Sequence, residues 1–177
     1  MLEGEENLVE EAKQGNPEAF GQLYDHYLPK IYRFVLIKVA YREQAEDITQ
    51  QTFFKAWRSM KRYQSKGYPF GSWLYRIARN SVIDHYRKTK EEVDIENVSE
   101  EILGVDNTLS QNLDSKFEWE TILKSIKSLN DIEQDVLIMR FVEDMQHSEV
   151  ARVVDKSENA VKVIQHRAIK KLEERLK

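Results

Sequence analysis

The sequence contains no cysteine among its 177 residues. Disulfide bonds and thiolate-bound metal sites are therefore excluded, and the chain suits a reducing cytoplasm. No apolar run approaches the roughly 20 residues that a membrane-spanning helix requires. The first residues, "MLEGEENLVEEAKQG", are acidic where a signal peptide would be basic and then apolar. We expect a cytoplasmic protein without a membrane span.

The net charge of −4 is distributed unevenly along the chain. Residues 1–90 carry 15 basic and 11 acidic side chains, and residues 116–177 carry 12 of each. Residues 91–115 carry no basic and 8 acidic side chains. The overall acidity therefore belongs to the middle of the chain and does not exclude a nucleic-acid partner for either end.

The acidic middle also divides the chain into two units. Residues 91–115 have few large apolar side chains and no sustained helical period, which favours an extended or weakly ordered linker. On either side, glycine and proline are scarce and apolar residues recur at helical spacing. The pattern predicts an all-α protein with two small helical domains, over 1–90 and 116–177, joined by the acidic linker.

Local signals indicate where several helices begin and end. Asn16 followed by Pro17, Asn130 followed three residues later by Glu133, and Ser157 are typical helix starts. Pro29 is expected to kink or break the second helix. The segment "QSKGYPFGS" over 64–72 predicts a turn-forming interruption in the first half.

The helix predicted over 73–90, "WLYRIARNSVIDHYRKTK", has a basic stripe. At 100° per residue, Leu74 and Ala78 fall on the core-facing side, and the opposite side gathers Arg76, Arg79, Asn80, Ile83, Arg87 and Lys90. The loop before it supplies the rings of Tyr63, Tyr68 and Phe70. Cations next to rings suit single-stranded nucleic acid, because cations neutralise phosphates and unpaired bases stack on rings. The alternative is that the rings are core residues and the cations a solvated face.

The helix predicted over 41–60 presents an apolar side and a mixed side. The mixed side holds Asp47, Gln50, Gln51, Phe54 and Arg58. A phenylalanine surrounded by polar side chains is typical of a protein interface, although Phe54 packing inside its own domain is the alternative.

The second half ends with helix-turn-helix spacing, with a tight turn near 155–157. On the last helix, the face opposite the apolar stripe carries Asn159, Lys162, Val163, His166, Arg167 and Lys170. Amide, imidazole and cationic groups near a helix start suit major-groove reading and phosphate contact. A solvated face on a plain helical hairpin is the alternative.

Catalytic and metal-binding interpretations find little support. The four histidines have no cysteine companions, and adjacent Asp-His pairs diverge by about 100° on a helix. Glu143, Asp144 and His147 are close in sequence, but capping and solvation explain them better. No glycine-rich phosphate loop or nucleophile motif is present. We expect no enzymatic activity, no metal and no cofactor.

These segments together resemble one family. "AEDITQQTFFKAW", "FGSWLYRIARNSVIDHYRK" and, after a short linker, "AVKVIQHRAIKKL" resemble the extracytoplasmic-function (ECF) group of bacterial sigma factors, in the sigma-70 class. The resemblance covers residues 7–90 and 116–177 in the family's order. It implies a region 2-like N-terminal domain, a region 4-like C-terminal domain and a promoter-specificity subunit of RNA polymerase.

The resemblance also implies a role for each face. Core-polymerase binding, on the β′ clamp helices, is assigned to Asp47, Gln50, Gln51, Phe54 and Arg58. Recognition and melting of the minus-ten element is assigned to Tyr63, Tyr68, Phe70, Arg76, Arg79, Asn80 and Arg87. Major-groove contact with the minus-thirty-five element is assigned to Asn159, Lys162, Val163, His166, Arg167 and Lys170. The implied partners are core RNA polymerase through β′ and β, promoter DNA and an anti-sigma factor.

Several positions depart from the family's pattern. Asp155 occupies the turn position often held by glycine, in a left-handed conformation that aspartate tolerates less well. Gln146 stands where an N-cap serine is usual. Val163 can contact a thymine methyl but cannot hydrogen-bond guanine, so the preferred promoter is expected to be individual.

Two other functions remain open from the residues alone. A stand-alone helix-turn-helix regulator would dimerise and bind palindromic operators, and it leaves the Phe54 face unexplained. A helical adaptor that binds only proteins leaves the basic stripe and the aromatic loop unexplained.

Overall fold

The computed structural model describes residues 2–89 and 121–175, and every regular element in these ranges is helical. The N-terminal half consists of α1 (Glu5–Lys13), α2 (Pro17–Val39), α3 (Arg42–Ser59), the 3-10 turn η1 (Met60–Arg62) and α4 (Phe70–Thr89). The C-terminal half consists of a helical segment over 121–127, α7 (Asp131–Leu137), the π-helical turn η3 (Ile138–Val142), α8 (His147–Val154) and α9 (Glu158–Arg175). The all-α prediction is confirmed for these ranges. The acidic linker predicted over 91–115 lies outside the described residues.

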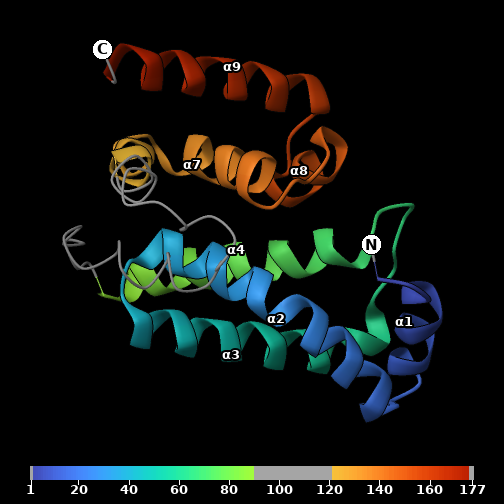
Figure 1. The fold of residues 1–177 in the computed structure, drawn as a ribbon. Helices are drawn as coiled ribbons and strands as arrows, with labels where there is room; N and C mark the ends of the chain where they lie inside the picture. The colour runs from blue at the N-terminus through green and yellow to red at the C-terminus, as the bar shows by residue number, and fades with distance from the viewer. Residues whose placement is uncertain (1, 90–120, 176–177) are drawn as a thin grey trace.

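The helices are stacked in layers (Figure 1). α2 and α3 pack side by side, and α4 contacts both of them. α8 packs on α4, and α9 covers α7 and α8 on the side away from α4. One connected cluster of buried apolar side chains includes Phe34 and Leu74 from the first half and Val136 and Ile138 from the second. The two halves therefore share a core in this structure.

The predicted helix starts are confirmed by their hydrogen bonds. The Asn16 side-chain oxygen accepts from the backbone N–H groups of Glu18 at 3.0 Å and Ala19 at 3.3 Å. Asn130 and Glu133 form a reciprocal capping box at the start of α7. Such caps satisfy N–H groups that have no partner within the helix.

Of the two outcomes expected for Pro29, a kink or a break in the second helix, the break does not occur. α2 continues from Pro17 to Val39 with Pro29 inside it. Pro29 is exposed, and so is Asp25, whose carbonyl loses its helical donor, so water can hydrate that group. Burial of Tyr27 and Ile31 on the opposite side holds the helix together across the proline.

The helix-turn-helix prediction is confirmed. α8 ends at Val154, and its C-cap residue Asp155 has φ 56° and ψ 50°, the left-handed conformation expected for the glycine-like turn position. The Ser157 hydroxyl accepts from the Ala160 N–H at 3.1 Å and begins α9. Gln146 is the N-cap of α8, and the Glu149 carboxylate accepts from its backbone N–H at 2.6 Å. Val161 and Ala168 are buried where α9 packs on the rest of the half.

The left-handed turn predicts a stabilising substitution. Replacing Asp155 with glycine removes the steric cost of a Cβ at positive φ, and we expect a gain of about 0.5–1 kcal/mol in the free energy of unfolding, measured by urea titration. Lys156→Gly is the matched control. The φ of Lys156 is not positive, so glycine at this position should lower the free energy of unfolding by about 0.5–1 kcal/mol. Equal losses for both variants would contradict this account of the turn.

Candidate functional site

The mixed face of α3 is exposed as predicted. Phe54 is 62% exposed, and the Arg58 guanidinium lies 5.6 Å from the centre of its ring. The neighbouring Asp47, Gln50 and Gln51 are also exposed. The structure therefore excludes the alternative that Phe54 packs inside its own domain.

An apolar hollow that the sequence did not reveal lies beside Phe54. It has a volume of about 370 Å³ and runs between α2 and α3. Trp57 is 36% exposed, and its ring centre lies 4.9 Å from that of Phe20. Trp57 follows Phe54 by three residues, a spacing that places both on one side of a helix, whereas the contribution of Phe20 depends on tertiary packing. The face is thus broader and more apolar than predicted.

The aromatic loop is more buried than a base-stacking surface would be. Tyr63 and Phe70 are only 5% and 3% exposed. Their ring centres lie 5.5 Å apart, and each packs against Trp73, at 4.8 Å from Tyr63 and 5.4 Å from Phe70. Tyr63 and Phe70 are therefore core residues, which is the alternative to a base-stacking role. Tyr68 is half-buried, with the Arg152 guanidinium of α8 4.9 Å from its ring centre.

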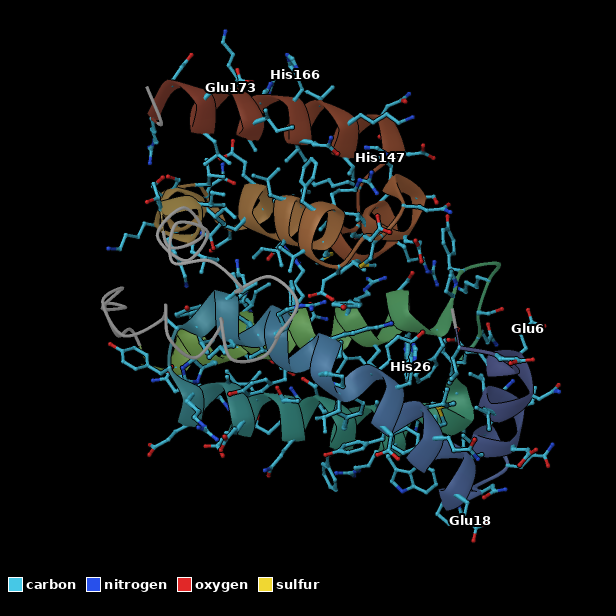
Figure 2. The ribbon with its side chains drawn as sticks, viewed as in Figure 1. Glu6, Glu18, His26, His147, His166 and Glu173 are labelled. Atoms are coloured by element: carbon cyan, nitrogen blue, oxygen red, sulfur yellow. The ribbon has the colours of Figure 1, made fainter. Side chains whose placement is uncertain are left out.

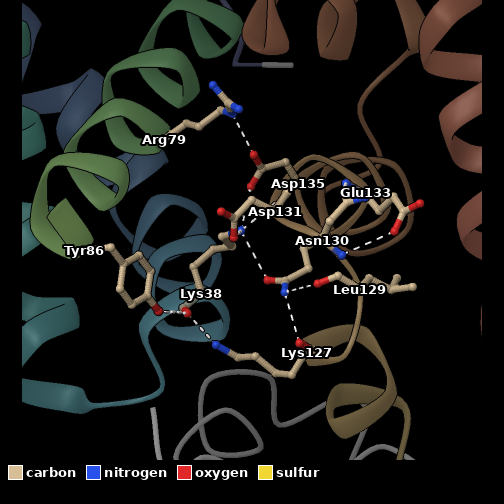
Figure 3. Close-up of polar contacts among 10 residues, drawn as sticks. Lys38, Arg79, Tyr86, Lys127, Leu129, Asn130, Asp131, Glu133 and Asp135 are labelled. Carbon is tan, nitrogen blue, oxygen red and sulfur yellow. Dashed lines mark hydrogen bonds and ion pairs between the residues drawn. The ribbon is translucent and has the colours of Figure 1, made fainter. Parts of the chain in front are cut away.

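The basic stripe of α4 is partly covered by the C-terminal half. Asn80 and Arg87 are exposed and Arg76 is half-buried. Arg79, by contrast, forms an ion pair from its Nε to Oδ2 of Asp135 on α7 at 2.6 Å (Figure 3). The second carboxylate oxygen of Asp135 lies 3.0 Å from the buried Nζ of Lys38 on α2.

Other polar groups surround this ion pair (Figure 3). The Gln134 side-chain oxygen accepts from Lys38 Nζ at 3.2 Å. The backbone carbonyl of Lys38 accepts from the Tyr86 hydroxyl at 2.5 Å and also from Lys127. Burial, reinforced by the Lys38 ammonium, lowers the pKa of Lys127 to about 8. The cationic side of α4 is thus tied to α7 through a network of charges.

A second buried carboxylate connects the halves, and it corrects the expectation that Glu143 is solvated. Its side chain is 1% exposed, and its two oxygens accept from Arg33 Nε at 2.8 Å and Nη2 at 3.0 Å. The Tyr75 hydroxyl donates to the same carboxylate at 2.6 Å. Burial and then the Glu143 charge raise the pKa of Tyr75 well above its ordinary value. The partners come from α2 and α4, which local sequence patterns could not identify.

The outer face of α9 is open, as predicted. Asn159, Lys162, His166, Arg167 and Lys170 are exposed, and Val163 is 49% exposed. His166 points away from the layers beneath α9 (Figure 2). Lys162 forms an exposed ion pair with Glu158 at 2.9 Å, which lowers the pKa of the Glu158 carboxyl. DNA phosphates can compete for Lys162 at little cost, because exposed ion pairs are weak.

No catalytic or metal-binding cluster forms within residues 2–89 and 121–175. His26, His147 and His166 lie on three different helices (Figure 2), and His147 pairs with the side chain of Gln165 at 2.9 Å. No group of three His, Asp or Glu side chains in the described part of the chain is arranged to hold a metal ion. Nor is any helix there long and apolar enough to cross a bilayer.

Comparisons with known proteins match both halves. The family described as Sigma-70 region 2 matches residues 23–92, and Sigma-70, region 4 matches residues 125–174. The ECF RNA polymerase sigma factor BldN of Streptomyces coelicolor is 34% identical over 168 residues, 93% of this chain. The chain spans 63% of that relative's length. SigW of Bacillus subtilis, also an ECF RNA polymerase sigma factor, is 28% identical over 178 residues, covering 96% of this chain and 95% of SigW.

A solved structure has a similar fold. The sigma factor RpoE of Bartonella quintana, in complex with the anti-sigma factor NepR, matches with a TM-score of 0.71 and 20% identity. The match covers 89% of this chain and 96% of RpoE. Because the two sigma-70 matches occur in order on the two helical halves and together span more than half of the residues, the chain belongs to the extracytoplasmic-function group of the sigma-70 family.

Proposed function

We propose that this chain is a promoter-specificity subunit of bacterial RNA polymerase, which recognises and melts promoter DNA as part of the holoenzyme. The observation that carries the proposal is the pairing of a region 2-like half with a region 4-like half, each with an exposed face of suitable chemistry. The chain itself catalyses nothing, because the polymerase supplies the chemistry. Since its partner is the polymerase, it acts in the cytoplasm. Its domains extend over 1–90 and 116–177, with the linker between them.

The α3 face is the proposed binding site for the β′ clamp helices. Phe54 provides an exposed aromatic anchor, and Asp47, Gln50, Gln51 and Arg58 provide a polar rim, an arrangement typical of protein-binding hot spots. The hollow lined by Phe20 and Trp57 extends the apolar centre. This face is open while the two halves are packed together, so the polymerase can engage it first.

The minus-ten element is the proposed ligand of α4 and its preceding loop, through Tyr68, Arg76, Arg79, Asn80 and Arg87, while the buried Tyr63 and Phe70 hold the ends of the loop. The minus-thirty-five element is the proposed ligand of the outer α9 face. The centres of these elements are about 25 base pairs apart, or about 85 Å at about 3.4 Å per pair. α9 packs on α7, which contacts α4, so its face lies only about 20 Å from α4. The halves must therefore separate before both can bind.

Separation of the halves also exposes DNA-binding groups. Arg79 would leave Asp135, and Tyr68 would leave Arg152, so both become available to the minus-ten strand. The free protein should accordingly bind promoter DNA weakly. An anti-sigma factor is a further proposed partner, because the similar RpoE structure contains one.

The polymerase-binding proposal predicts a selective loss of affinity. Phe54→Ala removes the aromatic anchor and should weaken binding to a β′ fragment containing the clamp helices by about tenfold or more, measured by calorimetry. Phe141→Ala is the matched control, because Phe141 is 61% exposed but lies on η3 in the other half. The control should bind within about twofold of wild type. Equal affinities for all three proteins would contradict the assignment of the α3 face.

The minus-thirty-five proposal predicts that Val163 reads a thymine methyl. Replacing the thymines of that element with deoxyuridine removes the methyl groups and should weaken promoter binding by the wild-type holoenzyme about three- to fourfold. The Val163→Ala holoenzyme should bind both templates equally. The Lys162→Gln holoenzyme should bind both templates more weakly than wild type, but it should still prefer the thymine template over the deoxyuridine template. The reason is that a phosphate contact is independent of base identity. A wild-type holoenzyme that does not distinguish the templates would contradict the role of Val163.

A further inference from the structure

The carboxylate of Glu5, on the first turn of α1, is buried against a distant part of the chain. Glu5 is only 8% exposed. Its Oε2 accepts from the Tyr27 hydroxyl at 2.7 Å, and its Oε1 accepts from the Phe70 backbone N–H at 3.3 Å. A carboxylate removed from water needs such partners, because an unpaired buried charge is costly. Each oxygen of the Glu5 carboxylate is therefore engaged in one of these two hydrogen bonds.

Both contacts bear on the start of α4. Phe70 is the first residue of that helix, so its N–H has no acceptor within the helix, and a negative charge there is favoured by the helix dipole. Tyr27 packs edge-on against Phe70 with ring centres 5.7 Å apart. The Tyr27 ring also lies against Gly71, where an added Cβ would come within 2.9 Å of it. Glu5 thus fixes Phe70 both directly and through the Tyr27 ring.

The start of α4 is one end of the loop over 63–69. At the other end, Tyr63 packs on the rings of Phe70 and Trp73. Burial and the Glu5 charge raise the pKa of Tyr63 to about 12, which is consistent with the closeness of that carboxylate. Between these ends, Lys66 and Gly67 have positive φ and are exposed. The loop therefore has two fixed ends and an open tip.

We propose that Glu5 is a positioning residue for promoter melting, which holds the loop over 63–69 and the start of α4 in the arrangement that captures the minus-ten strand. This inference rests on the proposed function. Glu5 itself is buried and need not touch DNA, so its contribution passes through Phe70 and Tyr27. A preorganised loop loses less conformational freedom when it captures an unpaired base.

The test compares Glu5→Gln with Glu6→Gln. Both variants remove one negative charge from the first turn of α1, but Glu6 is exposed (Figure 2). Glutamine at position 5 keeps the length of the side chain but has one oxygen for two donors, so one buried donor loses its acceptor. Each holoenzyme is assayed on a promoter that the wild-type holoenzyme selects from random sequence, as an intact duplex and with the minus-ten region already unpaired by mismatches.

The rate of open-complex formation is monitored by 2-aminopurine fluorescence. On the duplex, this rate should be about tenfold lower for Glu5→Gln than for wild type. On the template with the unpaired minus-ten region, the rate for Glu5→Gln should be within about threefold of wild type, because the bases there are already unpaired. Affinity for core polymerase should stay within about twofold of wild type, and Glu6→Gln should match wild type throughout. Tyr27→Phe should slow opening in the same way, and combining it with Glu5→Gln should add little, because both act on one contact.

Two results would overturn the inference. The first is that the Glu5→Gln holoenzyme opens the duplex promoter at the same rate as the wild-type holoenzyme. The other is an equal loss on both templates together with weaker core binding, which would make Glu5 a residue of general stability. Failure of the proposed function looks different, because wild type itself would then neither bind core polymerase nor select a promoter, and both proposals would be rejected.

Discussion

The placement of the two halves depends on two buried carboxylates at their interface. Glu143 is paired with Arg33 and Tyr75, and Asp135 bridges Lys38 and Arg79. A buried carboxylate without partners would be strongly destabilising, so the halves can close only in the register that pairs both charges. Apolar contacts supply most of the contact area, but they do not specify a register in this way. The charges therefore determine which face of α4 is covered.

In this arrangement, the three proposed binding faces are not equally accessible to polymerase and DNA. The α3 face with Phe54 and the outer α9 face are open while the halves are closed, but the minus-ten face is partly covered by α7 and α8. The two carboxylates also occupy cations of α2 and α4, as DNA phosphates would. Binding of polymerase to the open α3 face can therefore precede exposure of the minus-ten face. Until that exposure, the covered minus-ten face limits DNA binding by the free protein.

Much of this architecture could be predicted from the sequence, because it depends on local rules. Helical period placed Phe54 and Val163 on exposed faces, and capping residues marked the starts of α2 and α7. The rest depends on contacts between distant residues. Arg33 and Glu143 are separated by 110 positions, and no local pattern identifies one as the partner of the other. The burial of Tyr63 and Phe70 likewise follows from tertiary packing around Glu5, Tyr27 and Trp73.

The central claim is that the closed arrangement opens when the protein joins the polymerase. The absence of cysteine allows unique labelling at two introduced cysteines, Lys88→Cys and Lys124→Cys, because both lysines are exposed. Lys88 follows Arg87 and Lys124 lies one helical turn before Lys127, and Arg87 and Lys127 both line one hollow between the halves. Energy transfer between the dyes should be high in the free protein and fall sharply on addition of core polymerase and promoter DNA. Efficient transfer that persists in a transcribing holoenzyme would contradict the account, because the covered face of α4 would then not need to be released.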